Sequence, residues 1–319
     1  YTIDQCALYR LGSKARLSAV LGITLDWLLQ LAESEKNYCL FNLPEEVCPF
    51  TRRVKKARAV QAPKNGLRTV HERILHLLRP IILPTYAHAG IKGKSYRSNA
   101  AAHKDSPRLA AFDIRKFYPS TTASRVYYFF ADKMLCSPDV ARLLTALTCY
   151  KNGLPTGSPL SPLLSLHANM PMFDSLEALA LSNDLVFTCY VDDLTFSGEK
   201  LPIGLPRLVK GIVEKYGHKV SEEKTRLYRR RQGKHVTGTV LLDGRILVPN
   251  TRFHKARAIS AALASERDPA LRLELGRKLS GLLGEAAFID DRYAKWASDS
   301  YISLRKLQAD FACEEASLD

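Results

Sequence analysis

The chain has 319 residues, of which 46% are hydrophobic, so it can bury a sizeable core and is expected to contain more than one subdomain. Its 47 lysines and arginines outnumber 32 acidic residues, and the net charge of +15 favours a polyanionic partner, nucleic acid before a membrane surface. The sequence shows neither an apolar span of about 18 residues nor a signal peptide, which predicts a soluble, cytoplasmic protein that binds no membrane.

Residues 1–44 are predicted to form a small helical extension. Leu17, Val20 and Leu21 form one apolar cluster, and Thr24 is placed to cap a second helical segment around Trp27. A packed accessory helix is a better interpretation than an RNA contact. Because the sequence starts at a tyrosine, we expect a starting methionine and a few residues to be missing before it.

A strongly basic segment begins at residue 51. Its only acid is Glu72, against eight cations: Arg52, Arg53, Lys55, Lys56, Arg58, Lys64, Arg68 and Arg73. This excess is larger than a solvated face usually needs, and it favours contacts with phosphate groups. Thr69 and Glu72 fit a capping box, which predicts that a helix opens there and runs through Arg79.

Asn99 and His103 are four residues apart and would share one helical face, where a structural hydrogen-bonded pair is the interpretation that spacing alone favours. The apolar run 109–114 is interrupted only by Asp113, which predicts a buried strand that delivers this carboxylate to the end of a sheet. On pattern alone, Tyr118 is an ordinary core aromatic. A loop rich in proline and glycine follows at 154–162, and an apolar helix is predicted from Leu163 to about Leu179.

Two adjacent carboxylates, Asp192 and Asp193, stand between apolar runs that read as the two strands of a hairpin. A polar turn and a metal site are about equally good interpretations of this stretch alone. Asp113 shifts the balance, because carboxylates that repel one another need a counter-cation. Two Mg²⁺ ions about 3.5–4 Å apart can activate an attacking hydroxyl and stabilise the leaving oxygen of a phosphoryl transfer.

The C-terminal third alternates between helices and a hairpin. A helix is predicted from Leu205 to Tyr216, where Gly217 stops it. After a basic run that starts at Lys224, the pair Asp243-Gly244 predicts a type I′ hairpin. Three amphipathic helices are predicted at about 250–265, 269–284 and 290–311.

The order of these features resembles that of reverse transcriptases. Asp113 and the segment Tyr190-Val191-Asp192-Asp193 look like the A and C motifs, the loop 154–162 looks like the B motif, and Lys224 falls in the D motif. The resemblance implies an α+β right-hand polymerase fold. Residues 1–44 would be an N-terminal extension, 45–235 the fingers and palm, and 236–319 a primer-grip hairpin and a helical thumb.

The same resemblance implies roles for individual residues. Asp113, Asp192 and Asp193, with the backbone of Ile114, would hold two Mg²⁺ ions, for which Mn²⁺ could substitute, and Lys224 would be the general acid. Nucleotide-binding positions would be Lys56, Arg58, Arg68, Gly157 and Tyr118, the last as a steric gate against the ribose 2′-hydroxyl. Primer or RNA contacts would be Asn99, His103, Tyr190, Val236, Thr237 and Gly238. The family commonly has glutamine where this chain has Thr156, which puts any contact that needs a long amide in doubt.

The segments Asn99 to His103 and Val236 to Gly238 resemble retron reverse transcriptases in particular. A retron enzyme copies a cognate structured non-coding RNA from an internal guanosine 2′-hydroxyl, uses deoxynucleoside triphosphates, and leaves branched RNA–DNA called msDNA. The resemblance also implies a separately encoded effector protein, a higher oligomer with it, and a role in anti-phage defence or a toxin–antitoxin system. The alternatives are a group II intron or diversity-generating reverse transcriptase and a catalytically silent RNA-binding scaffold, with a protein-primed or RNA-copying polymerase less favoured.

Overall fold

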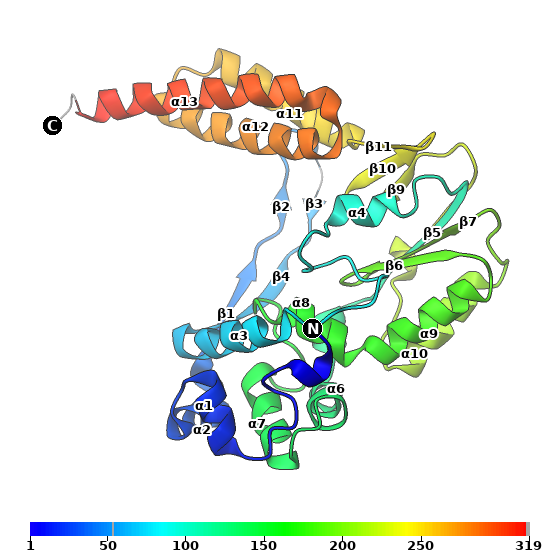
Figure 1. The fold of residues 1–319 in the computed structure, drawn as a ribbon. Coiled ribbons are helices and arrows are strands. Elements are labelled where there is room, and N and C mark those ends of the chain that lie inside the picture. The colour runs from blue at the N-terminus through cyan, green and yellow to red at the C-terminus, as the bar shows by residue number, and fades with distance from the viewer. Residues whose placement is uncertain (53, 317–319) are drawn as a thin grey trace. The chain divides into compact units, whose positions relative to one another are not determined.

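The computed structural model describes residues 1–52 and 54–316, without the side chains of 35 and 313–316. The chain has a mixed α+β fold with antiparallel sheets and C-terminal helices (Figure 1). It divides into two compact units: residues 1–44 with 57–230, and residues 45–56 with 231–319.

The first unit contains helices, a two-stranded ribbon and a four-stranded sheet. Up to residue 148 its elements are α1 (Lys14–Leu21), α2 (Leu25–Glu33), β1 (Tyr38–Leu43), β4 (Arg58–Pro63), α3 (Asn65–Leu78), α4 (Tyr96–Ala101), β5 (Arg108–Asp113), α5 (Phe117–Ser120), α6 (Ala123–Tyr128), a π-helical turn (Phe129–Lys133) and α7 (Pro138–Thr148). After it come α8 (Ser161–Ala168), α9 (Met170–Leu181), β6 (Val186–Tyr190), β7 (Asp193–Gly198), α10 (Leu205–Lys215), a 3₁₀ turn (Glu222–Lys224) and β8 (Arg226–Tyr228).

The four-stranded sheet has the order β6-β7-β5-β8, with every pair antiparallel. Phe112, Leu194 and Phe196 point from one face into a core shared with α9 and α10, which cover that face (Figure 1). The predicted strand at 109–114 and the predicted hairpin at 187–196 are both confirmed. Their alternating pattern suits a sheet with one apolar face, since successive side chains point to opposite sides.

A second core holds the helices at the start of the chain. Leu17 of α1, Leu28 of α2 and Ile74 of α3 are fully buried in a cluster that also includes Leu144 of α7. Helices of the predicted extension 1–44 are therefore present and packed, but its residues Tyr38–Leu43 form strand β1, which pairs with β4. Gly22 ends α1 in the left-handed conformation (φ 60°), as expected for a helix C-terminus.

Two predicted boundaries in the first unit are wrong. The helix expected to open at Thr69 begins at Asn65, and Thr69 lies inside it with its hydroxyl donating to the Asn65 carbonyl. The helix expected from Leu163 to about Leu179 is broken at Asn169, between α8 and α9. Asn169 donates to the Thr121 hydroxyl, and this tertiary contact, with a proline two residues later, marks the break.

The second unit combines short strands with three long helices. Its elements are β2 (Glu46–Val47), β3 (Val54–Lys55), β9 (Lys234–Val236), β10 (Thr239–Leu242), β11 (Arg245–Leu247), α11 (Asn250–Ser265), α12 (Pro269–Ile289), a 3₁₀ turn (Asp291–Tyr293) and α13 (Ala294–Ala316). The predicted helices are confirmed, and so is the hairpin at Asp243-Gly244, because both residues have positive φ (48° and 70°) as a type I′ turn requires. Phe50 packs against the core of α11 and α12, which joins the segment 45–56 to this unit.

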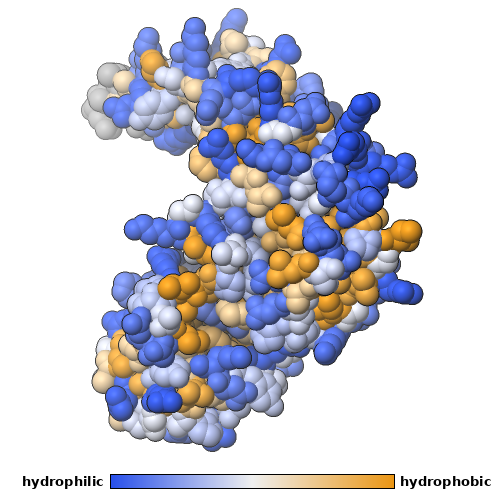
Figure 2. Space-filling model, turned by 45° about the vertical axis from the view of Figure 1, so that its right-hand side comes forward, coloured by the Kyte–Doolittle hydropathy of each residue, from blue (hydrophilic) through white to orange (hydrophobic). Residues whose placement is uncertain are grey.

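The surface is mostly hydrophilic on the face that Figure 2 shows, with apolar patches between the charged side chains. Single exposed apolar side chains include Leu181 and Ile203. Within the described residues, no single helix is both long and apolar enough to cross a membrane, and α1 with α2 meets that test only as a pair bent by 99°.

Candidate active site

The hairpin of β6 and β7 carries the two adjacent aspartates at its tip. Tyr190 pairs with Asp193, so only Val191 and Asp192 form the loop between the strands. Val191 has φ 60°, a left-handed conformation that is unusual for a β-branched residue and costs on the order of 1–3 kcal/mol. Backbone strain of this size persists only where the surroundings hold the chain, and it is often found at functional sites.

Asp113 lies directly across from this hairpin. It is the last residue of β5 and the cross-strand partner of Asp193, so the two side chains are on the same face of the sheet. The amide of Ile114 donates to the Asp192 carbonyl over 2.9 Å, and the amide of Ser221 donates to the Asp113 carbonyl over 2.8 Å. Three carboxylates therefore meet at one end of the sheet.

Burial and mutual repulsion raise the pKa values of the two hairpin carboxylates, Asp192 and Asp193. Burial first, and then the charges of Asp192 and Asp113, raise the pKa of Asp193 to about 7. The pKa of Asp192 is also raised, by burial and then by Asp113. The Lys224 ammonium donates to Asp113 Oδ2 over 2.7 Å, and this bond raises the pKa of Lys224, which stays charged at neutral pH.

This donor set fits a hard divalent cation. Carboxylate and carbonyl oxygens are the ligands that Mg²⁺ prefers, and a cation would relieve the repulsion among Asp113, Asp192 and Asp193. As they stand, however, no three or more His, Cys, Asp or Glu side chains in the described chain are arranged to hold a metal ion. Lys224 occupies one of the oxygens that such an ion would use.

Tyr118 lies beside the carboxylates. It follows Phe117, which is buried against Phe173, in the short helix α5. Burial first, and then the neighbouring Asp192 and Tyr190, raise the pKa of Tyr118 to about 12. The structure thus brings Tyr118 and Tyr190 to the same place as the aspartates.

Strand β4 fastens one side of the loop 154–160. The Gly157 amide donates to the Gln61 carbonyl over 3.0 Å, and the Thr156 amide and hydroxyl donate to Gln61 Oε1 over 3.2 and 3.1 Å. A Cβ added at Gly157 would lie 2.9 Å from the Gln61 carbonyl oxygen and 2.9 Å from Val60 Cγ1. Only glycine permits this close approach, so the loop and the strand are held together at Gly157.

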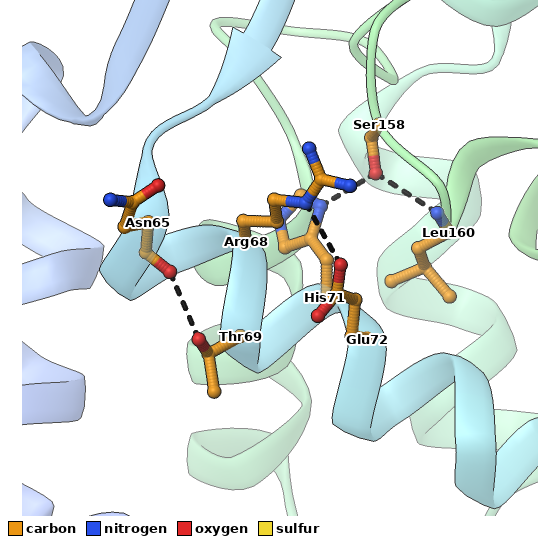
Figure 3. A network of polar contacts seen from close by, with 7 residues as sticks. All are labelled: Asn65, Arg68, Thr69, His71, Glu72, Ser158 and Leu160. Atoms are coloured by element: carbon orange, nitrogen blue, oxygen red, sulfur yellow. Dashed lines mark hydrogen bonds and ion pairs between the residues drawn. The ribbon is translucent and has the colours of Figure 1, made fainter. Parts of the chain in front are cut away.

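Helix α3 fastens the other side of the loop through His71 (Figure 3). His71 is fully buried, and its Nε2 lies 2.7 Å from the Leu147 carbonyl, which can only accept, so Nε2 carries the proton. Nδ1 is then the acceptor for the Ser158 hydroxyl at 2.6 Å, while Ser158 Oγ accepts from the Leu160 amide at 3.1 Å. Burial lowers the pKa of His71 to about 4, so this neutral form holds at pH 7.

Of the three cations predicted to bind the nucleotide, Arg58 and Arg68 belong to the same unit as this loop, and the third belongs to the other unit. Arg58 is the first residue of β4 and is exposed. Arg68 is on α3, where it pairs with Glu72 at 2.8 Å (Figure 3). Lys56 belongs to the second unit.

The structure places Asn99 and His103 inside the first unit, with no exposed surface on either residue. His103 bonds to Ser197 of β7 and Thr188 of β6, each at 2.7 Å. By strand alternation, both partners are on the face of the sheet that carries the aspartates. His103 therefore links the two strands of the hairpin on the face that carries the aspartates.

Val236, Thr237 and Gly238 belong to the second unit, whereas the three carboxylates belong to the first. Thr237 and Gly238 form the turn between β9 and β10, and both have positive φ (39° and 83°). This first hairpin precedes the one at Asp243-Gly244, so the three strands form one sheet in the order β11-β10-β9. The sequence analysis anticipated only the later hairpin.

Gln61, His71 and Ser158 are the residues that sequence reasoning missed. One signal was present for His71, since it falls among Leu67, Val70 and Ile74 on the apolar face of α3, where a histidine needs polar partners. Gln61 and Ser158 carry no comparable signal in the sequence.

Comparison with known proteins agrees with this geometry. Residues 50–241 match the family model described as reverse transcriptase (RNA-dependent DNA polymerase). The chain belongs to this family of polymerases.

Among its relatives are several retron reverse transcriptases. The chain is 31% identical to the retron Se72 reverse transcriptase of Salmonella heidelberg over 66% of its own length and 55% of that protein. It is 26% identical to the retron Ec86 reverse transcriptase of Escherichia coli, covering 64% of each protein, and 23% identical to the retron Ec83 reverse transcriptase of Escherichia coli, covering 90% of this chain and 98% of that one. The matches to the first two relatives thus span between about half and two thirds of their length.

Proposed function

We propose that this protein is the RNA-directed DNA polymerase of a retron. The observation that carries the proposal is the meeting of Asp113, Asp192 and Asp193 at one end of an antiparallel sheet, with Lys224 beside them. In a right-hand polymerase fold, the four-stranded sheet would be the palm, the ribbon of β1 and β4 would belong to the fingers, and α11 to α13 would form the thumb.

In this reaction the residues of the site would bind metal ions and transfer a proton. Asp113, Asp192 and Asp193, with the Ile114 carbonyl, would hold two Mg²⁺ ions, which supply activation of the primer hydroxyl and stabilisation of the leaving pyrophosphate. Lys224 is protonated at neutral pH and would deliver a proton to the leaving group once it releases Asp113.

The nucleotide would be held by groups around the loop 154–160. Arg58 and Arg68, in the same unit as the loop, would supply positive charge for the triphosphate, and the glycine at 157 lets the loop approach β4 closely. Tyr118, partly buried next to Asp192, would exclude a ribose 2′-hydroxyl and so favour deoxynucleotides.

The retron assignment rests on the relatives and on two local features. His103 and Asn99 have no exposed surface, so we assign them an indirect role in which they brace the catalytic hairpin. The turn at Thr237-Gly238 is a constrained hairpin tip suited to a primer contact, next to Val236. Template RNA would be a structured RNA encoded nearby, primed from a guanosine 2′-hydroxyl, with a separately encoded effector as a further partner in anti-phage defence.

The test is to express the chain with the RNA encoded beside it and to analyse the nucleic acid that copurifies. We expect a DNA strand whose mobility changes after RNase and debranching treatment, and which is absent from Asp192→Asn. The control is Asp105→Asn, an exposed aspartate outside the site.

The outcomes separate the alternatives. A DNA product without a branch, made from an annealed primer, would keep the reverse transcriptase and reject the retron. Bound RNA with no DNA under any priming condition would favour a silent RNA-binding scaffold. An Asp192→Asn protein that no longer folds or binds RNA would leave Asp113→Asn as the second variant for the same question.

A further inference from the structure

A hollow of about 610 Å³ lies in the first unit, among α2, β1, α6 and α7. Its volume is within the usual range of about 300–1,000 Å³ for sites that bind small ligands. The lining includes the buried leucines Leu31 and Leu67 and the exposed Ala146. None of the carboxylates of the candidate active site lines it, so it is a separate feature of the molecule.

Aromatic rings and cations also line the hollow. Among the residues whose side chains the structure describes, the lining includes the tyrosines Tyr38, Tyr127 and Tyr150 and the cations Lys36, Arg142 and Lys151, against one acid, Glu33. The rings of Tyr38 and Tyr150 meet edge to face, with centroids 4.9 Å apart, and the Lys151 ammonium lies 5.6 Å from the centre of the Tyr150 ring. Cations next to aromatic faces are the pattern that binds single-stranded nucleic acid.

Hydrogen bonds and close packing fix Tyr38 and the turn 150–153 of this hollow. The Tyr38 hydroxyl donates to the Cys149 carbonyl over 3.4 Å, which fixes the ring. Tyr150 and Gly153 exchange two backbone hydrogen bonds of 2.9 and 3.2 Å around a turn in which Lys151 adopts a left-handed conformation (φ 53°). A Cβ at Gly153 would lie 2.4 Å from the Pro119 carbonyl oxygen, so the turn is pressed against α5.

We propose that this hollow binds an unpaired segment of RNA, with bases on Tyr127 and Tyr150 and phosphates on Lys36, Arg142 and Lys151. The choice of RNA as the ligand class rests on the proposed function and on the charge of the hollow, where three cations face one acid among the described side chains. Because the rings and the turn are already fixed, binding orders few side chains, which favours affinity. The site reads no sequence by itself, since stacking and charge act on any base.

The first test measures binding of a short fluorescent oligouridine to the full chain at several salt concentrations. We expect Lys36→Ala/Arg142→Ala/Lys151→Ala to weaken binding at least tenfold and to reduce the slope of log K against log salt by about 2, as loss of three phosphate contacts requires. The matched control removes three exposed cations of the same unit that do not line the hollow: Lys133→Ala/Arg207→Ala/Lys215→Ala.

The second test locates the bound strand. RNA that contains 4-thiouridine should cross-link to peptides with Tyr127 or Tyr150. These cross-links should disappear in Lys36→Ala/Arg142→Ala/Lys151→Ala, while the thermal unfolding profile of that variant matches the profile of the control variant. Equal binding by the two triple variants, cross-links only elsewhere, or equal competition by an acidic peptide would overturn the proposal. DNA synthesis is not the readout, so failure here is distinct from failure of the polymerase assignment.

Discussion

Replacing Ser158 by alanine would test how the loop 154–160 is held. The hydroxyl serves two buried groups, the Leu160 amide and His71 Nδ1, at 3.1 and 2.6 Å. His71 has no freedom to find another donor, because its Nε2 is bonded to Leu147 and the ring is fully buried. Leaving a buried polar group without a partner costs about 1–3 kcal/mol. Because two such groups lose their partner, Ser158→Ala is expected to lower the free energy of unfolding of the first unit by about 2–6 kcal/mol.

The matched control is Ser165→Ala. Ser165 is also fully buried, but its hydroxyl donates only to the Pro162 carbonyl within α8, so its loss should cost about 1 kcal/mol or less. Urea unfolding followed by circular dichroism measures the difference, and hydrogen exchange of peptides spanning the loop should show faster exchange at the Leu160 amide in Ser158→Ala alone. Equal destabilisation by the two substitutions, with unchanged exchange in the loop, would refute the hydrogen-bond chain.

Three further results are expected. Gly157→Ala should destabilise the first unit by about 1–3 kcal/mol and raise KM for deoxynucleotides, because its methyl group would collide with β4; steady-state kinetics and urea unfolding measure both effects. Burial lowers the pKa of His71 to about 4 and of His103 to about 3, so only the unfolded chain takes up these protons below about pH 6.5. Stability should therefore be full above that pH and fall as the pH drops towards 4, and a flat profile of denaturation midpoints would contradict this. Lys224→Ala should slow DNA synthesis by about 10²–10⁴ yet bind Mn²⁺ more tightly in spin-resonance titrations, because Asp113 loses its competing cation.

Much of the local structure could be predicted from the sequence because it depends on short-range patterns. Alternating apolar residues around Asp192 and Asp193 predict a hairpin with one apolar face, and the structure has one. Asp243-Gly244 forms the expected turn because few other pairs tolerate two positive φ angles. The helix boundary at Thr69 was wrong because helix α3 already begins at Asn65, and the one at Asn169 was wrong because a tertiary contact with Thr121 overrode the local signal there.

The candidate site, too, could be predicted from the sequence only in part. The acidic residues were identifiable from the sequence, because carboxylates placed in or beside apolar strands are costly without a cation. Their pairing across β5 and β7 required the fold, as did the bond from Lys224 to Asp113.

The sequence by itself determined the charge of the protein, its main helices and strands, and which carboxylates could carry chemistry. Only the tertiary structure showed that Gln61 and His71 hold the loop 154–160, that Asn99 and His103 are buried, and that the segment 45–56 packs with the C-terminal helices. The physical reason is that periodicity and turn chemistry act over a few residues. Contacts between residues nearly a hundred positions apart depend on how whole elements pack together, and no local pattern records this.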